Sequence, residues 1–133
     1  MTPGERLVAA IVVALEAAEG IAGKVPVFDA PPARGSRPHL VIDEPVQGDW
    51  GAKGVEAREY RVTVRGADSG ERPVRLRGIG EAVDGAMRGL QRDLGEGWRL
   101  ASVALVRARM LREGGDRWVL ASEWRVRMVR PAG

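Results

Sequence analysis

Residues 38–66 read PHLVIDEPVQGDWGAKGVEAREYRVTVRG, and this stretch decides the fold. A short apolar run opens it, a proline stops that run, and a polar loop rich in glycine follows. Alternate apolar residues from Tyr60 to Val64 then share one face. Alternation with a period of two is typical of a strand that is buried on one face only. The segment therefore predicts two strands, at about 39–43 and 56–66, joined by a loop.

The loop between these strands carries a tryptophan among small and polar residues. Asp49 precedes Trp50, and Lys53 follows three positions later. Tryptophan is a favoured anchor of protein interfaces, and its place in a polar loop is harder to explain by packing in the core. Two interpretations remain open: the indole ring folds back onto its own sheet, or it contacts a neighbouring molecule.

A helix is predicted for the first part of the chain, where apolar residues recur every three or four positions. Thr2 and Glu5 have the spacing of a capping box, and Gly20 or Gly23 is expected to end the helix. Its apolar arc is wide, so the helix is covered either by a sheet or by a neighbouring subunit. Residues 24–37 are rich in proline and predict a connector with a short extended piece.

A second helix is predicted from about Pro73 to Leu94, because apolar residues again step by three or four. The four glycines inside it indicate close approach of another backbone, or a helix that relies on tertiary contacts. Gly95–Gly97 should end this helix. A long strand at 98–112 and its partner at 118–129 then form a hairpin around a turn of two glycines and an aspartate.

The order of elements is therefore helix, two strands, helix and two strands. This order predicts an α+β fold: a mainly antiparallel four-stranded sheet with two helices packed on one face and a long C-terminal hairpin. A length of 133 residues fits one domain that spans residues 1–133.

The composition argues against several kinds of chemistry. The chain has no cysteine, which excludes disulfides, thiolate catalysis and cysteine-ligated zinc and fits assembly in a reducing cytosol. His39 is the only histidine, and a structural or exposed role is favoured over a general base. Asp43 and Glu44 could bind a cation, but an exposed strand end before a proline is the favoured interpretation. We expect no enzyme activity, no catalytic or metal-binding residues, no cofactor and no membrane span.

The C-terminal third of the chain is rich in arginine. Arg107 and Arg109 alternate on one predicted strand, and Arg125 and Arg127 alternate on the next, so each pair lies on one face of the sheet. Such a face can bind phosphates, and an arginine-rich nucleic-acid-binding module is the alternative function. Single-strand binders usually add aromatic side chains that stack on bases, whereas the tryptophans of the last strand are expected on the opposite face. A solvated or subunit-facing surface with ion pairs is therefore favoured, and the charged lining of a pore remains open as a third interpretation.

Three segments of the chain resemble the tail-completion, or tail-terminator, proteins of phages and gene transfer agents with long tails. They are the strand Pro38–Ile42, the loop Gly48–Gly51 and the strand Glu59–Val64. The order of the predicted elements resembles that family as well, and the resemblance covers about residues 4–130.

The resemblance implies a structural protein that forms a ring, typically a hexamer, at the end of the tail tube. Its implied partners are further copies of itself, the tail tube protein and the head–tail connector or stopper protein, with DNA passing through the ring without sequence-specific binding. The implied location is the tail–neck junction of a virion or gene-transfer-agent particle assembled in the bacterial cytoplasm. Within this interpretation we expect a set of residues to contact neighbouring subunits or the tube: Asp49, Trp50, Lys53, Arg112, Arg117, Arg125 and Arg127.

Overall fold

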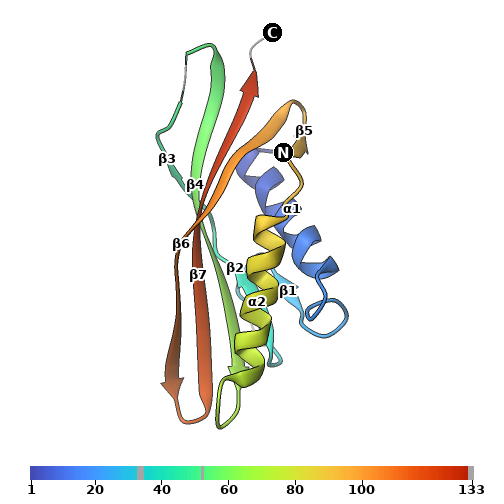
Figure 1. The fold of residues 1–133 in the computed structure, drawn as a ribbon, viewed down its shortest axis with the longest axis vertical. Coiled ribbons are helices and arrows are strands. Elements are labelled where there is room, and N and C mark those ends of the chain that lie inside the picture. The colour runs from blue at the N-terminus through green and yellow to red at the C-terminus, as the bar shows by residue number, and fades with distance from the viewer. Residues whose placement is uncertain (33–34, 52, 132–133) are drawn as a thin grey trace.

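The computed structural model describes residues 1–32, 35–51 and 53–131. In these residues the chain forms two helices and seven strands (Figure 1). In chain order they are α1 (Pro3–Ala17), β1 (Val27–Phe28), β2 (His39–Ile42), β3 (Val46–Gly48), β4 (Val55–Ser69), α2 (Val74–Arg88), β5 (Asp93–Gly95), β6 (Trp98–Gly114) and β7 (Arg117–Pro131).

The strands form one mixed sheet in the order β1-β2-β4-β7-β6-β5, with β3 beside β4. All pairs are antiparallel except β1 with β2. The α+β class and the long C-terminal strands are confirmed. The predicted sheet, four-stranded and mainly antiparallel, is wrong in strand number, because the sheet has seven strands and is mixed through the one parallel pair. The three additional strands are only two or three residues long, and such short strands carry no usable alternation.

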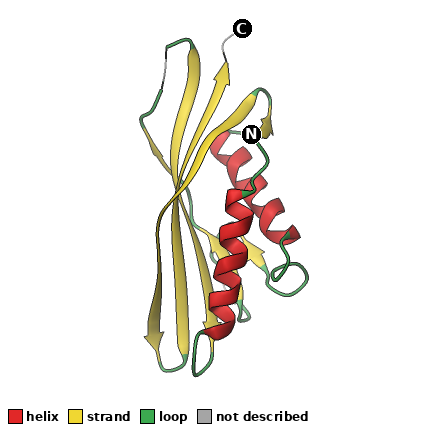
Figure 2. Cartoon of the chain, in the orientation of Figure 1, coloured by secondary structure: helices red, strands yellow, loops and turns green. Residues whose placement is uncertain are grey.

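Both helices pack on one face of the sheet, which we call the inner face (Figure 2). Among the described residues, the opposite, outer face carries no helix. The inner side chains of β4 and β7 are almost completely buried, as the alternation predicted. Burying a large apolar side chain contributes about 1.5–3 kcal/mol. The core combines them with the apolar stripes of both helices: Leu7, Ile11, Leu15, Leu40, Ile42, Tyr60, Val62, Val64, Leu76, Ile79, Val83, Met87, Trp98, Leu100, Trp124, Val126 and Met128.

The first helix begins as predicted and ends earlier. The Thr2 hydroxyl accepts a hydrogen bond from the Glu5 amide at 3.1 Å, and the Glu5 carboxylate accepts one from the Thr2 amide at 2.9 Å. The prediction that Gly20 or Gly23 ends the helix is wrong, because Ala18 already adopts an extended conformation and caps it.

The second helix is also shorter than predicted, ending at Arg88 with Gly89 as its cap. Leu90 and Leu94 nevertheless reach the core, Leu94 from β5. Their spacing continues the apolar stripe of the helix although the helix has already ended. This coincidence explains why the helix was predicted to extend to Leu94. Of the four glycines, Gly80 shows the close approach: a Cβ atom there would overlap the side chain of Leu120 on β7.

An ion pair between the buried Asp68 and the exposed Arg75 fixes the start of α2 against the sheet. Asp68 on β4 is 4% exposed and accepts hydrogen bonds from Arg75 Nε at 2.8 Å and from Arg75 Nη2 at 2.6 Å. The Ser69 amide donates a third, at 2.8 Å. These bonds, those from Arg75 first, hold the pKa of the Asp68 carboxyl below its usual value.

Candidate functional site

The outer face of the sheet carries the alternating arginines. The strand register places Arg125 opposite Arg61, Arg127 opposite Glu59, and Arg107 opposite Glu123. Trp124 lies on the inner face, where it is completely buried. The prediction that the arginines and this tryptophan occupy opposite faces is confirmed.

Carboxylates neutralise much of this arginine face. Arg65 Nη2 lies 2.7 Å from Asp43 Oδ1, and this hydrogen bond is the main reason that the pKa of Arg65 is raised. Arg127 Nε donates to Glu59 Oε1 at 2.9 Å. Glu123 lies between two arginines, 3.7 Å from Arg61 Nη1 and 3.7 Å from Arg107 Nε. The outer face is thus a ladder of opposite charges rather than a uniformly basic strip.

Arg109 and Arg125 are among the arginines of the outer face that lie outside this pairing. Within the part of the chain that the structure describes, Arg109 makes no ion pair with a carboxylate. The Nε atom of Arg125 is buried and has no hydrogen-bond partner among the same residues. The exposed guanidinium of Arg109 therefore has capacity left for an external partner, whereas the unpaired Nε of Arg125 is closed off from solvent.

The loop between β3 and β4 brings Trp50 back onto the outer face. The guanidinium carbon of Arg127 lies 5.1 Å from the centre of the Trp50 ring, within the range of a cation–π contact. Trp50 is half-buried by this contact, whereas Asp49 and Lys53 are exposed. One aromatic ring therefore does lie beside the arginines. The strand tryptophans alone had predicted no aromatic ring on this face.

The hairpin between β6 and β7 holds the remaining predicted site residues. Arg112 Nε donates to the Gly115 carbonyl at 2.7 Å, and the guanidinium stacks over Trp118. Trp118 Nε1 in turn donates to the Gly70 carbonyl at 3.0 Å, which ties the hairpin to the loop between β4 and α2. Arg117 is exposed beside the turn.

The predicted contact residues therefore do not form one site. The loop between β3 and β4 lies at one end of the molecule and the β6–β7 hairpin turn at the other (Figure 1). Trp50 and Arg127 are brought together at the first end, and Arg112 and Arg117 lie at the second. Arg125 lies between the two ends, opposite Arg61 in the middle of the sheet.

The side chains considered for catalysis or cation binding, His39, Asp43 and Glu44, are not assembled into a reactive centre. Asp43 is engaged by Arg65, and His39 Nδ1 lies 2.8 Å from the Ser36 carbonyl. In the ranges 1–32, 35–51 and 53–131 no cluster of histidine or acidic side chains could hold a metal ion. The helices described there are also too short or too polar to cross a membrane.

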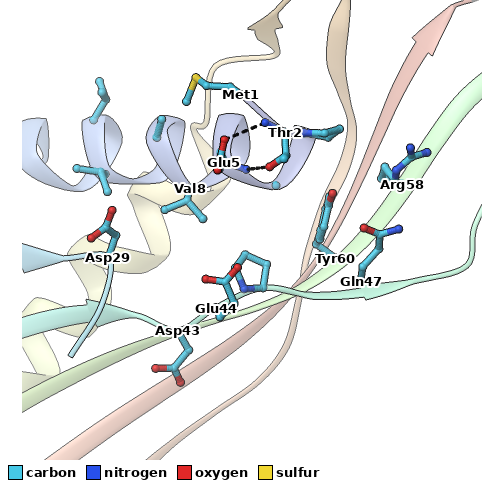
Figure 3. Close-up of a pocket in the computed structure, with 16 residues that line it drawn as sticks. Met1, Thr2, Glu5, Val8, Asp29, Asp43, Glu44, Gln47, Arg58 and Tyr60 are labelled. Carbon is cyan, nitrogen blue, oxygen red and sulfur yellow. Dashed lines mark hydrogen bonds between the residues drawn. The ribbon is translucent and has the colours of Figure 1, made fainter.

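A groove of about 970 Å³ lies between α1 and the segment from β2 to β3 (Figure 3). Val8 points from α1 toward Glu44, whereas Asp43 points away from the helix. Asp29 adds a second carboxylate to the wall, and Tyr60 from β4 also lines the groove. Burial raises the pKa of the Tyr60 hydroxyl, so this group is neutral. The groove combines an apolar helix wall with acidic side chains on the opposite wall.

A second uncovered region follows β6. Only Trp98 and Arg99 of this strand pair with β5, so from residue 101 to the hairpin turn one edge of β6 has no neighbouring strand among the described residues. Leu105, Val106 and Leu111 are 38%, 43% and 44% exposed along it. A groove of about 530 Å³ separates this strand from α2. Sequence reasoning missed this edge, although two consecutive apolar residues in an arginine-rich strand were a usable signal.

Comparison with known proteins identifies the family. No curated protein matches the sequence. A chain of a solved structure described as "Virion of native gene transfer agent (GTA) particle" is similar in fold, with a TM-score of 0.79 and 22% identity, covering 91% of this chain and 92% of that one. The family described as "Tail completion protein gp17" matches residues 5–127. This match spans both helices and nearly the whole sheet, and the chain therefore belongs to the family of phage tail completion proteins.

Proposed function

We propose that this chain forms a ring that caps the tail tube and joins it to the head-side connector. Membership of the tail completion family assigns it a structural role in a tail. The ring is supported by two unlike uncovered surfaces on the molecule, the open edge of β6 and the groove beside α1. A closed ring of identical subunits needs two different surfaces that meet head to tail.

The two ends of the molecule suit contacts along the axis of the tail. The Trp50 loop and the hairpin turn near Arg117 lie far apart at opposite ends of the sheet. In this proposal one end meets the tail tube protein and the other meets the connector or stopper protein. The particle is a virion or a gene transfer agent, the place is its tail–neck junction, and assembly takes place in the bacterial cytoplasm.

The ring is expected to hold six copies, with DNA passing through it without sequence-specific contacts. An arginine-bearing surface with many neutralising carboxylates fits such passage, because a strongly basic lumen would hold DNA tightly. Arg125 and Arg127 would belong to that surface or to subunit contacts, and no catalytic group or cofactor is required.

Polymerisation of the tail tube protein provides the test. Tube protein polymerised with this chain should give tubes of limited length that carry a ring at one end, seen by electron microscopy. Without the chain, the tubes should grow longer and show bare ends. Tubes of unchanged length with no density at their ends would contradict the capping role.

The alternative function is an arginine-rich nucleic-acid-binding module. It is favoured by Arg109, which lacks an acidic partner among the described residues, and by the Trp50 ring beside Arg127. This function predicts that DNA binds at physiological salt with an affinity that falls steeply as salt rises. Absence of a gel shift at low salt would remove it, whereas a steep salt dependence whose slope falls by about one in Arg109→Ala would favour it over the ring.

A further inference from the structure

The sheet has open edges on both of its sides. In the strand order, β6 lies beyond β7 on one side, and β2 and β3 lie beyond β4 on the other. An exposed edge strand offers unpaired backbone groups to another chain, and monomeric proteins usually protect such edges. The β6 edge instead exposes apolar side chains, including Val106 at 43%. We call residues 101–113 the β6 edge and the groove between α1 and the β2–β3 segment the α1 groove.

The helix wall of the α1 groove also exposes apolar side chains. Val13 is 67% exposed, and Val8 and Val12 are partly buried. These residues belong to the wide apolar arc of α1, of which Leu7, Ile11 and Leu15 reach the core. The apolar residues of α1 that are not buried in the core therefore face the groove.

The charges of the two surfaces are largely opposite, although Arg58 also lines the α1 groove. The β6 edge carries Arg107 and Arg109, both exposed, and Arg109 has no carboxylate partner among residues 1–32, 35–51 and 53–131. The α1 groove carries Asp29 and Glu44, both exposed, and neither forms an ion pair within those same ranges. Complementary charges favour one orientation of two docking surfaces and oppose the pairing of like with like.

We propose that the β6 edge of one copy docks in the α1 groove of the next copy. Val106 and Leu105 meet the exposed valines of α1, and Arg107 and Arg109 approach Asp29 and Glu44. The partner in the α1 groove is a second copy of this chain, because one molecule carries both complementary surfaces. They lie toward opposite edges of the sheet. A symmetric pairing of two β6 edges would place arginine against arginine. The proposal rests on the proposed ring and names its subunit contact.

Charge reversal tests the pairing. One variant carries Arg107→Glu and Arg109→Glu, and the other carries Asp29→Arg and Glu44→Arg. Each variant alone brings like charges together, so self-association should fall at least about tenfold. Mixed in equal amounts, the two variants restore opposite charges at every contact and should assemble again, alternating around the ring. The measurement is the mass distribution in mass photometry, both for free protein and for protein with tail tube ends.

Cysteine cross-linking provides a second readout that does not depend on charge. The chain contains no cysteine, so an introduced pair reports one contact. Val106→Cys and Val13→Cys chains, mixed under oxidising conditions, should form a covalent dimer, whereas neither should do so alone. Val74→Cys, which is 58% exposed at the start of α2, is the matched control and should not cross-link with either.

The outcomes separate this contact from the proposed function. If wild-type protein caps tubes and both charge variants also assemble, the proposed contact is wrong and the ring stands. If the groove variant assembles and only the edge variant fails, or if folded variants fail to recover on mixing, the proposed contact is again overturned. If wild-type protein neither associates nor caps tubes and Val106→Cys does not cross-link to Val13→Cys, the proposed function and the contact fail together.

Discussion

The two faces of β7 differ sharply although their residues alternate along one strand. On the inner face, Trp124, Val126 and Met128 are each 0% exposed and belong to the core. On the outer face, Arg125 and Arg127 are only partly buried, and no helix covers them. Consecutive residues of β7 therefore alternate between the core and the surface. Substitutions on the inner face should act on folding, whereas substitutions on the outer face should act on contacts with other molecules.

The largest effect is expected from Trp124→Ala. Removing this completely buried ring should lower the free energy of unfolding by about 3–5 kcal/mol, because it leaves a cavity in the core. It also removes the hydrogen bond from the indole Nε1 to Ser122 Oγ, which measures 3.1 Å. Urea unfolding followed by circular dichroism measures the change. Arg125→Ala, one residue away on the outer face, is the control and should change stability by less than about 1 kcal/mol. Equal losses of stability in the two variants would contradict the different roles of the two faces.

The next effect is expected from Asp68→Asn, at the polar end of the inner face. Asparagine keeps the shape but weakens the hydrogen bonds with Arg75, which should cost about 1–3 kcal/mol at neutral pH. The pKa of Asp68 is lowered in the folded protein, chiefly by Arg75. Its stabilising contribution is therefore complete above the unfolded-state pKa of about 3.9 and is lost as the pH falls toward the folded-state pKa.

The pH dependence of unfolding separates this role from simple packing. Between neutral pH and pH values below about 4, the wild type should lose more stability than Asp68→Asn, so the two unfolding curves should converge on acidification. Asp84→Asn disrupts the exposed pair with Arg88 and is the control, with a much smaller expected cost because water screens an exposed pair. Parallel curves for the wild type and Asp68→Asn would mean that the carboxylate charge of Asp68 does not stabilise the fold.

A smaller effect is expected from Glu59→Gln on the outer face. Its ion pair with Arg127 measures 2.9 Å but is partly open to water, so its loss should cost about 0.2–1 kcal/mol. High salt should reduce the difference between variant and wild type, because ions screen exposed charges. Thermal unfolding at low and high salt measures this. A cost as large as that of Trp124→Ala would show that the outer face also supports the fold.

The sequence predicted the inner face well and the sheet edges poorly. Alternation identified the buried sides of β4 and β7 because a long half-buried strand carries that signal in its own residues. The strands β1, β3 and β5 are too short to alternate, and Leu94 continued a helical stripe after the helix had ended. Local patterns therefore predicted which side chains are buried but not how many strands pair.

The candidate site shows the same limit. The sequence correctly placed Arg125 and Arg127 on one face, since that follows from their spacing alone. The contact of Trp50 with Arg127 and the open edge of β6 were not predictable, because both depend on which distant segments become neighbours. The wide apolar arc of α1 was visible in the sequence, but the groove beside α1 needs the positions of Asp29 and Glu44 in space.

The smallest effect on folding, and the sharpest test of the comparison, is expected from Trp50→Ala. The ring is only half-buried and stacks with Arg127, so its removal should cost at most about 1 kcal/mol in the isolated chain. If the loop contacts a neighbouring subunit or the tail tube, the same change should reduce assembly at tube ends, as measured by electron microscopy. Trp50→Phe keeps an aromatic ring over Arg127 and should retain most of the assembly. A loss of stability comparable with that of Trp124→Ala would assign Trp50 to the core, and the outer face would then have no aromatic contact residue at this end.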